Sequence, residues 1–327
     1  MAGSGPSSDT FETVRRIRRA VGSVVVGKSE AVDQLLIALL CRGHALLEDV
    51  PGVGKTLLAR SLAAAVGCEF RRVQFTPDVL PSDVTGSSVF DQRRADFEFR
   101  PGPVFTQVLL ADEINRATPR AQSSLLEAME ERQVTVDGRS MPLPEPFFVL
   151  ATQNPVELEG TFPLPEAQLD RFLVRVAVGY PTEDEEDAII RRFEDDNPLT
   201  RLHPVATPDE LLGLQHGRGE VLVSDPVRSY LIGVVRATRH DQRLALGASP
   251  RAGLALHRAV QARALLHERA YVLPDDVKAL AVPVLAHRLV LTPQARLRGE
   301  SAAGVVAGVV SDLPVTVEDE SVAAAGG

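Results

Sequence analysis

A short glycine-rich segment narrows the possible folds of this chain more than any other part of the sequence. The run Gly52-Val53-Gly54-Lys55-Thr56 follows the apolar segment 44–47 and opens a helical pattern that extends from Leu57 to about position 66. Backbone N–H groups at the beginning of a helix attract anions, and glycine lets a phosphate approach the backbone closely. Lys55 can supply positive charge to the phosphates, and the Thr56 hydroxyl can bind Mg²⁺. The segment therefore predicts a strand–loop–helix unit that binds a triphosphate.

This segment departs from the general phosphate-loop pattern at one position. The pattern G-x-x-x-x-G-K-[ST] requires glycine where this chain has Asp49. A carboxylate near phosphate groups is unfavourable unless its side chain points away from them. A chance glycine-rich turn is the alternative interpretation of the segment taken alone, so the prediction depends on further motifs downstream of the loop.

Two acidic residues, Asp112 and Glu113, follow the apolar run 108–111. In a parallel sheet the carboxyl ends of the strands share one edge with the phosphate loop. Asp112 can then hold the shell of Mg²⁺, and Glu113 can orient or deprotonate an attacking water. An ordinary acidic pair at a strand end is the alternative, but the phosphate loop upstream favours a site that hydrolyses ATP.

Asn154 follows the apolar run 147–152, so we expect its side chain to lie on the same edge of the sheet. Its amide can contact the γ-phosphate or the attacking water. Asparagine before proline is also a common turn residue. We favour the functional interpretation because of the position relative to the strand.

Two arginines are candidates for stabilising charge on the transferred phosphoryl group. Arg171 precedes the apolar run 172–178, and a salt bridge with Asp170 or Glu166 is its alternative role. Arg251 begins a helical segment in the second half of the chain, where a solvated charge is the alternative. A cation at the positive end of a helix is unfavourable, which supports a ligand role for Arg251.

Strand and helix patterns alternate up to position 180, which predicts an α/β domain with a parallel sheet covered by helices on both faces. Two insertions interrupt the alternation. One spans about 84–104, and the other, about 133–144, has the Asp137-Gly138 signal of a tight hairpin. Nearly all of 181–310 is helical in pattern. We expect a core domain at 11–180, a helical domain at 181–310, and disordered tails at 1–10 and 311–327.

Composition excludes several classes of function. The net charge is −9 and there is no tryptophan, so neither a basic surface nor an aromatic platform for nucleic acid is expected. Cys41 and Cys68 are too few for a disulfide or metal framework, and we expect two buried free thiols. The apolar runs are too short to span a membrane. The first residues are polar and lack the apolar core of a signal peptide, so we expect a cytoplasmic protein.

Taken together, these motifs resemble those of AAA+ ATPases of the MoxR family. The similarity covers roughly residues 11–290, and it lies in VVG at 25–27, EDVPGVGKT at 48–56, DEINR at 112–116, ATQNP at 151–155, PEAQLDRF at 165–172 and SPRA at 249–252. The combination is specific, whereas any single motif is not. Asp49 departs from the general phosphate-loop pattern, and the resemblance suggests that this family accepts it.

The resemblance implies a nucleotide-binding core with a five-stranded parallel sheet, a smaller all-helical lid, and assembly into rings that are usually hexamers. ATP then lies between neighbouring subunits. Asn154 would be sensor 1, Arg251 sensor 2 of the lid, and Arg171 the finger offered to the adjacent subunit. The nucleotide-binding set would be Val26, Gly27, Gly52, Val53, Gly54, Lys55, Thr56, Leu57 and Arg251. The two insertions would be the helix-2 insert and the pre-sensor-1 hairpin, both facing a central pore.

Such proteins act as chaperone-like factors that remodel or mature a client, often with a von Willebrand factor A domain partner. Three alternatives remain open: the ATPase subunit of a complex of the magnesium-chelatase type, a DNA-directed AAA+ protein, and a nucleotide-gated binding module with little turnover. The acidic chain argues against the DNA-directed protein, and the presence of Glu113 argues against the binding module.

Overall fold

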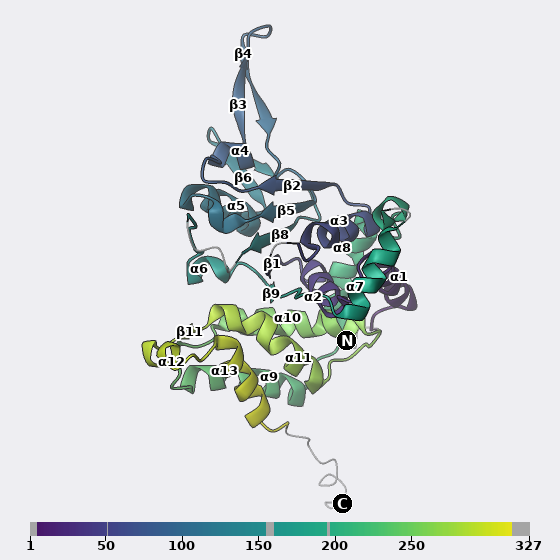
Figure 1. Cartoon of the computed structure of the whole chain (residues 1–327), viewed down its shortest axis with the longest axis vertical. Coiled ribbons are helices and arrows are strands. Elements are labelled where there is room, and N and C mark those ends of the chain that lie inside the picture. The colour runs from purple at the N-terminus through teal and green to yellow at the C-terminus, as the bar shows by residue number, and fades with distance from the viewer. Residues whose placement is uncertain (1–4, 51, 155–159, 195–196, 316–327) are drawn as a thin grey trace, which may run out of the picture. The chain divides into compact units, whose positions relative to one another are not determined.

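The computed structural model of the chain (Figure 1) describes residues 5–50, 52–154, 160–194 and 197–315. The chain divides into two compact units, a larger one of Ser7–Arg218 and a smaller one to which Gly219–Gly327 and Met1–Pro6 are assigned. The predicted tails 1–10 and 311–327 lie partly outside the described residues. Helix α1 (Ser8–Val24) begins inside the first of them, because the Ser7 hydroxyl accepts a hydrogen bond from the Thr10 amide at 3.2 Å and caps the helix.

The centre of the larger unit is the predicted five-stranded sheet, and all its pairings are parallel. The strand order is β2-β5-β8-β1-β9. The strands are β1 (Ala45–Glu48), β2 (Phe70–Gln74), β5 (Val108–Asp112), β8 (Phe148–Gln153) and β9 (Val174–Val176). The phosphate loop follows β1. Strand β8 is the neighbour of β1, β5 is the neighbour of β8, and the carboxyl ends of both lie on the same edge of the sheet as the loop.

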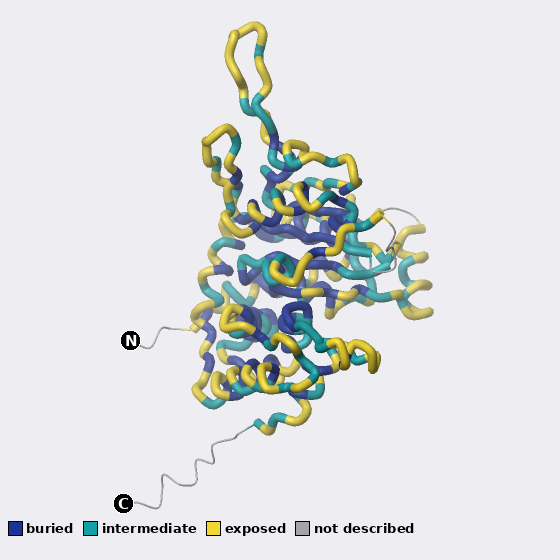
Figure 2. The backbone as a smooth tube through the Cα atoms, turned by 90° about the vertical axis from the view of Figure 1, so that its left-hand side faces the viewer, coloured by how far each residue is buried: buried dark blue, intermediate teal, exposed yellow. Residues whose placement is uncertain are grey.

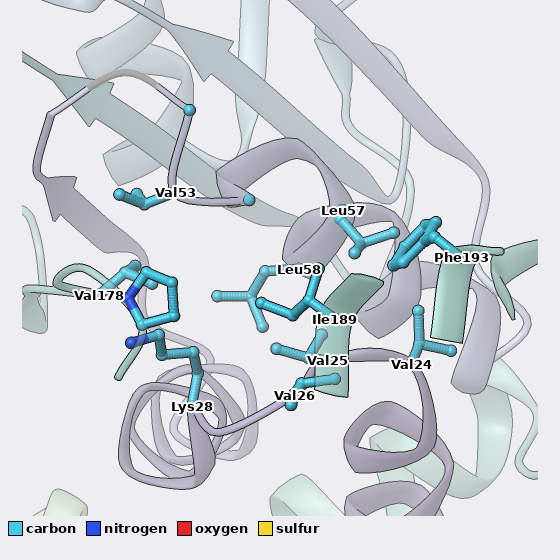
Figure 3. Close-up of a pocket in the computed structure, with 13 residues that line it drawn as sticks. Val24, Val25, Val26, Lys28, Val53, Leu57, Leu58, Val178, Ile189 and Phe193 are labelled. Carbon is cyan, nitrogen blue, oxygen red and sulfur yellow. The ribbon is translucent and has the colours of Figure 1, made fainter. Parts of the chain in front are cut away.

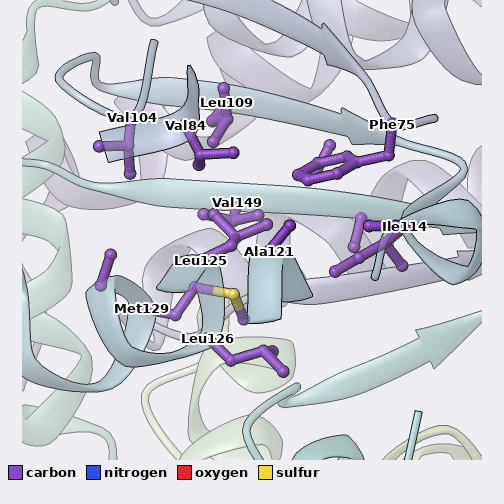
Figure 4. Packing of buried hydrophobic residues seen from close by; sticks show 14 of the residues in the cluster. Phe75, Val84, Val104, Leu109, Ile114, Ala121, Leu125, Leu126, Met129 and Val149 are labelled. Atoms are coloured by element: carbon purple, nitrogen blue, oxygen red, sulfur yellow. The ribbon is translucent and has the colours of Figure 1, made fainter. Parts of the chain in front are cut away.

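Both faces of the sheet are buried, as a parallel sheet between helices requires. On one face, Leu109 and Val149 pack against Leu125 and Met129 of α5 (Pro119–Glu131), as Figure 4 shows. Alternate strand residues such as Leu110 point to the opposite face. Helices α2 (Ser29–Leu40) and α3 (Lys55–Ala65) cover that face and contact β9, β2 and β5. This packing fixes the strand ends at which the candidate site lies.

The two predicted insertions are both hairpins. The first comprises the short helix α4 (Pro81–Thr85) and the antiparallel strands β3 (Gly86–Asp91) and β4 (Asp96–Pro101). The second comprises β6 (Gln133–Val136) and β7 (Arg139–Pro142), joined at Asp137 and Gly138, whose φ angles are 51° and 74°. The first hairpin extends away from the sheet and is exposed along most of its length (Figure 2). The rings of Phe90 and Phe97 meet edge to face on it and are 49% and 67% exposed.

The larger unit extends beyond the boundary expected at 180/181. It also contains α7 (Glu183–Phe193), η2 (Pro198–Arg201) and α8 (Pro208–Gly217). The buried Gln215 side chain donates to the Leu39 carbonyl at 2.8 Å, and the Val205 amide donates to the Ala65 carbonyl at 2.9 Å. These bonds fasten 198–218 to α2 and α3, so the division between compact units falls after Arg218 and not after position 180.

The smaller unit is nearly all helical, as predicted. Its core consists of buried apolar side chains such as Val234, Leu256, Leu280 and Val306. The carboxylate of the buried Asp276 accepts hydrogen bonds from both Nη atoms of Arg269 at 2.8 and 2.7 Å. The short helix η3 (Arg218–Glu220) spans the division between the two units. The other elements of the smaller unit are α9 (Asp225–His240), β10 (Leu244–Leu246), α10 (Pro250–Leu266), α11 (Pro274–Leu285), η4 (Ala286–Arg288), β11 (Val290–Leu291), α12 (Pro293–Leu297) and α13 (Ala302–Asp312).

Both cysteines are buried and neither forms a disulfide, as expected. Burial raises the pKa of the Cys68 thiol to about 12, so this thiol stays protonated and unreactive at neutral pH. None of the helices among the described residues is both long enough and apolar enough to cross a membrane.

A buried histidine makes the stability of the larger unit depend on pH. The Nδ1 atom of His44 accepts a hydrogen bond from the Val149 amide at 3.0 Å, so the other ring nitrogen carries the proton and donates to the Met129 carbonyl at 3.1 Å. Burial, with a smaller contribution from Arg132, lowers the pKa of His44 from 6.5 to about 3. The folded protein therefore keeps this ring neutral, whereas the unfolded chain protonates it below pH 6.5.

We expect His44 to lower the free energy of unfolding by about 1.4 kcal/mol per pH unit as the pH falls from 6.5 towards 3, and to contribute no pH dependence above 6.5. Urea unfolding between pH 4 and 8 measures this, with His44→Asn as the comparison, because asparagine retains an acceptor for Val149 but does not titrate. The variant should be less stable at pH 8, and its free energy of unfolding should lack the part of the pH dependence that His44 contributes below pH 6.5. Equal slopes in the two proteins would contradict the assignment.

Candidate functional site

The phosphate loop has the backbone shape that anion binding requires. Gly52 and Gly54 have φ angles of 87° and 86°, which side-chain-bearing residues rarely adopt, and Gly54 leads directly into α3. A Cβ atom at either glycine would meet no atom within 4 Å, so the space in front of the loop is open. The Lys55 ammonium donates to the carbonyls of Asp49 and Val50 at 2.7 and 3.1 Å. The ammonium group is thus held across the loop.

The electrostatics of Lys55 show that the loop belongs to a charged site. Burial lowers the pKa of Lys55, and the carboxylates of Asp49, Asp112 and Glu113 act in the opposite direction. Asp112 and Glu113 are therefore near enough to Lys55 to influence its charge, as the sequence predicted.

Asp49, which replaces the usual glycine, points away from the open side of the loop. One carboxylate oxygen accepts from the Val50 amide at 2.8 Å. The other accepts from the amides of Val178 and Gly179, at 2.8 and 2.5 Å. Asp49 thus ties the beginning of the loop to the segment that follows β9. This geometry explains how an acidic residue can occupy the position without repelling a bound phosphate.

We expect Asp49→Gly, which restores the general loop pattern, to lower the free energy of unfolding by about 1–3 kcal/mol, since three backbone amides lose a charged acceptor. Thermal or urea unfolding measures the change. Asp49→Asn, which keeps one oxygen, should lose less. A glycine variant as stable as the parent would show that these hydrogen bonds do not hold the loop.

The predicted phosphate and metal residues line one cavity of about 370 Å³. The loop, the acidic end of β5 and the residues at the end of β8 all contribute to it. Its lining consists of Gly52, Gly54, Lys55, Thr56, Arg72, Gln74, Asp112, Glu113, Thr152 and Asn154. The structure therefore brings together every catalytic and metal candidate of the larger unit except Arg171.

The Asp112 carboxylate is positioned by two neighbouring strands. Its Oδ1 accepts from the Thr152 hydroxyl at 2.5 Å, and its Oδ2 accepts from Nε and Nη2 of Arg72 at 3.1 and 2.6 Å. No motif in the sequence identified Arg72 or Gln74 as residues of this cavity. A period of two places both on the same face of β2, next to β5, and this alternation is the signal that could have found them.

Glu113 stands where the chain turns sharply after β5. Its φ and ψ angles are 57° and 48°, the left-handed region that is unfavourable for a residue with a side chain. Its amide donates to the Thr152 hydroxyl at 2.8 Å, and its carboxylate forms an ion pair with Arg116 at 3.1 Å. The turn and these contacts direct the carboxylate into the cavity.

The residues of the cavity fit a bound Mg²⁺. The Thr56 hydroxyl and the Asp112 carboxylate are hard oxygen donors, which this ion prefers, and both line the cavity. The described part of the chain contains no cluster of three or more His, Cys, Asp or Glu able to hold a metal. A magnesium ion here would therefore take its remaining ligands from phosphate oxygens and water.

A second cavity of about 310 Å³ lies on the other side of the loop and also includes Gly52 and Gly54 in its walls. It is mostly apolar, and Figure 3 shows side chains from the end of α1, from the loop and α3, and from α7 pointing into it. Its other lining residues are Val24, Val25, Val26, Lys28, Val53, Leu57, Leu58, Val178, Pro181, Ile189 and Phe193. A flat apolar ring fits such a space.

Some residues of the predicted nucleotide-binding set lie in the wall of this second cavity. Val26, Val53 and Leu57 of the predicted nucleotide-binding set line it, whereas Gly27 of the same set does not. A Cβ atom at Gly27 would lie 2.1 Å from the Glu185 carboxyl group, the end of a flexible side chain that can move aside. The φ angle of 71° is what favours glycine at this position. Ile189 and Phe193 were missed. They are four residues apart on one helix, a spacing that predicts a shared face.

Arg171 does not line the phosphate cavity. It forms an ion pair with Glu130 of α5 at 3.0 Å and donates to the Leu126 carbonyl of the same helix, contacts that the sequence analysis did not foresee. Its side chain is 29% exposed, in the wall of a separate polar cavity of about 490 Å³. The guanidinium is thus presented on a different part of the larger unit from the phosphate loop.

Asn154 and Arg251 occupy the positions that their patterns predict. Asn154 directly follows β8 and lines the phosphate cavity. Arg251 belongs to the smaller unit, in the first turn of α10, whose N-cap Ser249 accepts from the Ala252 amide at 3.1 Å. It is therefore a residue of the helical unit, as expected.

Comparisons with known proteins agree with this geometry. A family model described as "ATPase family associated with various cellular activities (AAA)" matches residues 44–174, and an AAA lid domain model matches residues 236–307. Protein YeaC of Bacillus subtilis is 49% identical over 302 residues, covering 92% of this chain and 94% of that protein. Chaperone MoxR1 of Mycobacterium tuberculosis is 45% identical over 289 residues, covering 86% of this chain and 76% of that protein.

A solved structure has the same fold. The crystal structure of a candidate ATPase from Cytophaga hutchinsonii superimposes with a TM-score of 0.88 at 38% identity, covering 94% of this chain and 96% of that one. The similarity extends over nearly the whole of both chains, including the two regions that the family models match.

Proposed function

Since the chain belongs to the MoxR family of AAA+ ATPases, we propose that it hydrolyses ATP in the presence of Mg²⁺ to remodel or mature a client protein. One observation carries this proposal. The cavity of about 370 Å³ collects a cationic loop, two carboxylates and an amide, and it shares Gly52 and Gly54 with an apolar cavity of about 310 Å³. Triphosphate and adenine therefore have adjoining places on the two sides of one loop.

Each side chain of the phosphate cavity has a chemical task in this proposal. Lys55 and the loop amides hold the β- and γ-phosphates, and Thr56 and Asp112 hold Mg²⁺, which neutralises phosphate charge when bound. Glu113 orients the attacking water and accepts its proton, and Asn154 positions that water or the γ-phosphate. Val26, Val53 and Leu57 enclose the adenine, and Gly27, with a φ angle of 71°, lets the chain turn beside them.

Two arginines outside the phosphate cavity complete the proposed catalytic machinery, one from the adjacent subunit and one from the helical unit. We place the nucleotide between subunits of a ring, a hexamer by resemblance to the family. Arg171 lies outside the phosphate cavity of its own chain, so it serves as the finger for the pocket of the adjacent subunit. Arg251 acts from the helical unit as sensor 2, contacting the phosphates when the lid closes on the nucleotide.

The two hairpins are the proposed contacts with the client, facing a central pore. The exposed rings of Phe90 and Phe97 give the first hairpin an apolar surface that an unfolded segment of polypeptide can use. We further propose a von Willebrand factor A domain protein as partner and a cytoplasmic location.

Calorimetry with ATP and Mg²⁺, followed by measurement of phosphate release, tests the proposal. We expect saturable ATP uptake that Lys55→Ala abolishes, and slow release of phosphate. If well-folded protein takes up no adenine nucleotide in the presence of Mg²⁺, the proposed function is wrong. Uptake without any phosphate release would instead favour the nucleotide-gated binding module.

A further inference from the structure

The phosphate cavity contains a second basic side chain that the proposed reaction does not use. Arg72 lies on β2, opposite Leu110 in the register of β2 with β5. Its guanidinium donates twice to Oδ2 of Asp112, at 3.1 and 2.6 Å, and also once to the Gln74 side chain at 2.9 Å. The Arg72 side chain is 47% exposed, whereas that of Asp112 is 13% exposed. The arginine thus approaches a mostly buried carboxylate from the open side of the cavity.

The two contacts of Arg72 use much of the bonding capacity of Asp112. A carboxylate oxygen has two lone pairs, and both of those on Oδ2 face an N–H group of Arg72. Oδ1 accepts from the Thr152 hydroxyl. The guanidinium also balances the negative charge that would attract a divalent cation. Arg72 and a metal ion therefore depend on the same carboxylate.

The Arg72 contact is not needed to pair the strands. The backbones of β2 and β5 are in register from Phe70 opposite Val108 to Gln74 opposite Asp112, and β2 is an edge strand of the sheet. The neighbouring Arg71 makes a different ion pair, with Glu69 at 2.8 Å. Because the Arg72 side chain is half-exposed and lies on an edge strand, it can move away from Asp112 without disturbing the core.

We propose that Arg72 is a positioning residue that competes with Mg²⁺ for the Asp112 carboxylate, so that metal-bound ATP is retained only when the guanidinium releases Asp112. This inference rests on the proposed function, because it takes Asp112 to hold the metal. It gives the protein a threshold: the concentration of Mg²⁺ at which nucleotide is retained is set by the strength of the Arg72–Asp112 ion pair.

The test is a titration with Mg²⁺ at a fixed concentration of fluorescent methylanthraniloyl-ATP. Removal of a charge-assisted double hydrogen bond should lower the Mg²⁺ midpoint of Arg72→Ala by about 10-fold or more. Arg72→Lys keeps the charge but not the two-pronged contact, so its midpoint should fall between those of the parent and Arg72→Ala. Arg71→Ala, on the same strand, is the matched control and should leave the midpoint unchanged.

Several outcomes separate this inference from the proposed function. If the parent retains the nucleotide and the midpoint of Arg72→Ala is the same or higher, the competition does not exist. If the parent binds no nucleotide at any concentration of Mg²⁺, the proposed function fails and the inference fails with it. Thermal unfolding checks that each variant is folded, and Arg72→Gln replaces the alanine variant if that one is unstable.

Discussion

Glu113→Gln should lower the rate of ATP hydrolysis by about 10²-fold or more while leaving ATP and Mg²⁺ binding close to that of the parent. A positioned general base contributes about this factor, and glutamine has the same shape but cannot accept the proton. The structure supports the assignment because the carboxylate lies in the wall of the phosphate cavity beside Asp112 and Asn154. Phosphate release under single-turnover conditions measures the rate, and calorimetry measures the binding.

The control for this variant is Glu69→Gln, which removes a carboxylate paired with Arg71 and outside the cavity lining. It should hydrolyse ATP at the parental rate. Glu113→Gln protein that turns over ATP as fast as the parent would show that another group acts as the base. If the variant traps ATP as expected, it is also the form with which to capture the client and any von Willebrand factor A domain partner.

The sequence predicts those parts of the fold that depend on local pattern. The phosphate loop, the acidic end of β5 and the hairpin turn at Asp137 and Gly138 each require particular residue types at a particular spacing. The parallel sheet follows from the alternation of apolar strands with helices, and its five strands are what the resemblance to the family implies.

Contacts between segments far apart in the chain could not be predicted in this way. The role of Asp49 is an example, because its carboxylate accepts hydrogen bonds from Val178 and Gly179, which lie about 130 residues further along the chain. The loop sequence alone gives no sign of these partners. The pairing of Arg72 with Asp112 depends on β2 being the neighbour of β5. The boundary expected at 180/181 followed the change from alternating strand and helix patterns to helix patterns alone. The compact unit instead ends where the hydrogen bonds of 198–218 to α2 and α3 end.

The ion pair of Arg171 with Glu130, which the sequence did not predict, concerns the residue whose replacement should lower ATP hydrolysis most. The Glu130 carboxylate and the Leu126 carbonyl hold the guanidinium on α5, which presents it away from the phosphate cavity of its own chain. We expect Arg171→Ala to lower ATP hydrolysis by about 10³-fold, the lower end of what an arginine finger contributes, with ATP binding nearly unchanged. Phosphate release and calorimetry on the same sample separate the two effects.

Mixing two inactive proteins distinguishes a finger that acts between subunits from an arginine that only stabilises its own helix. Lys55→Ala subunits lack a working phosphate loop but retain Arg171, whereas Arg171→Ala subunits retain the loop. In mixed rings some intact pockets face an intact arginine, so activity should return and should be greatest at intermediate ratios. Glu130→Gln removes the intrachain ion pair and should remain active by itself. Inactivity at every mixing ratio, together with an inactive Glu130→Gln protein, would assign Arg171 to the stability of α5 and remove the finger from the mechanism.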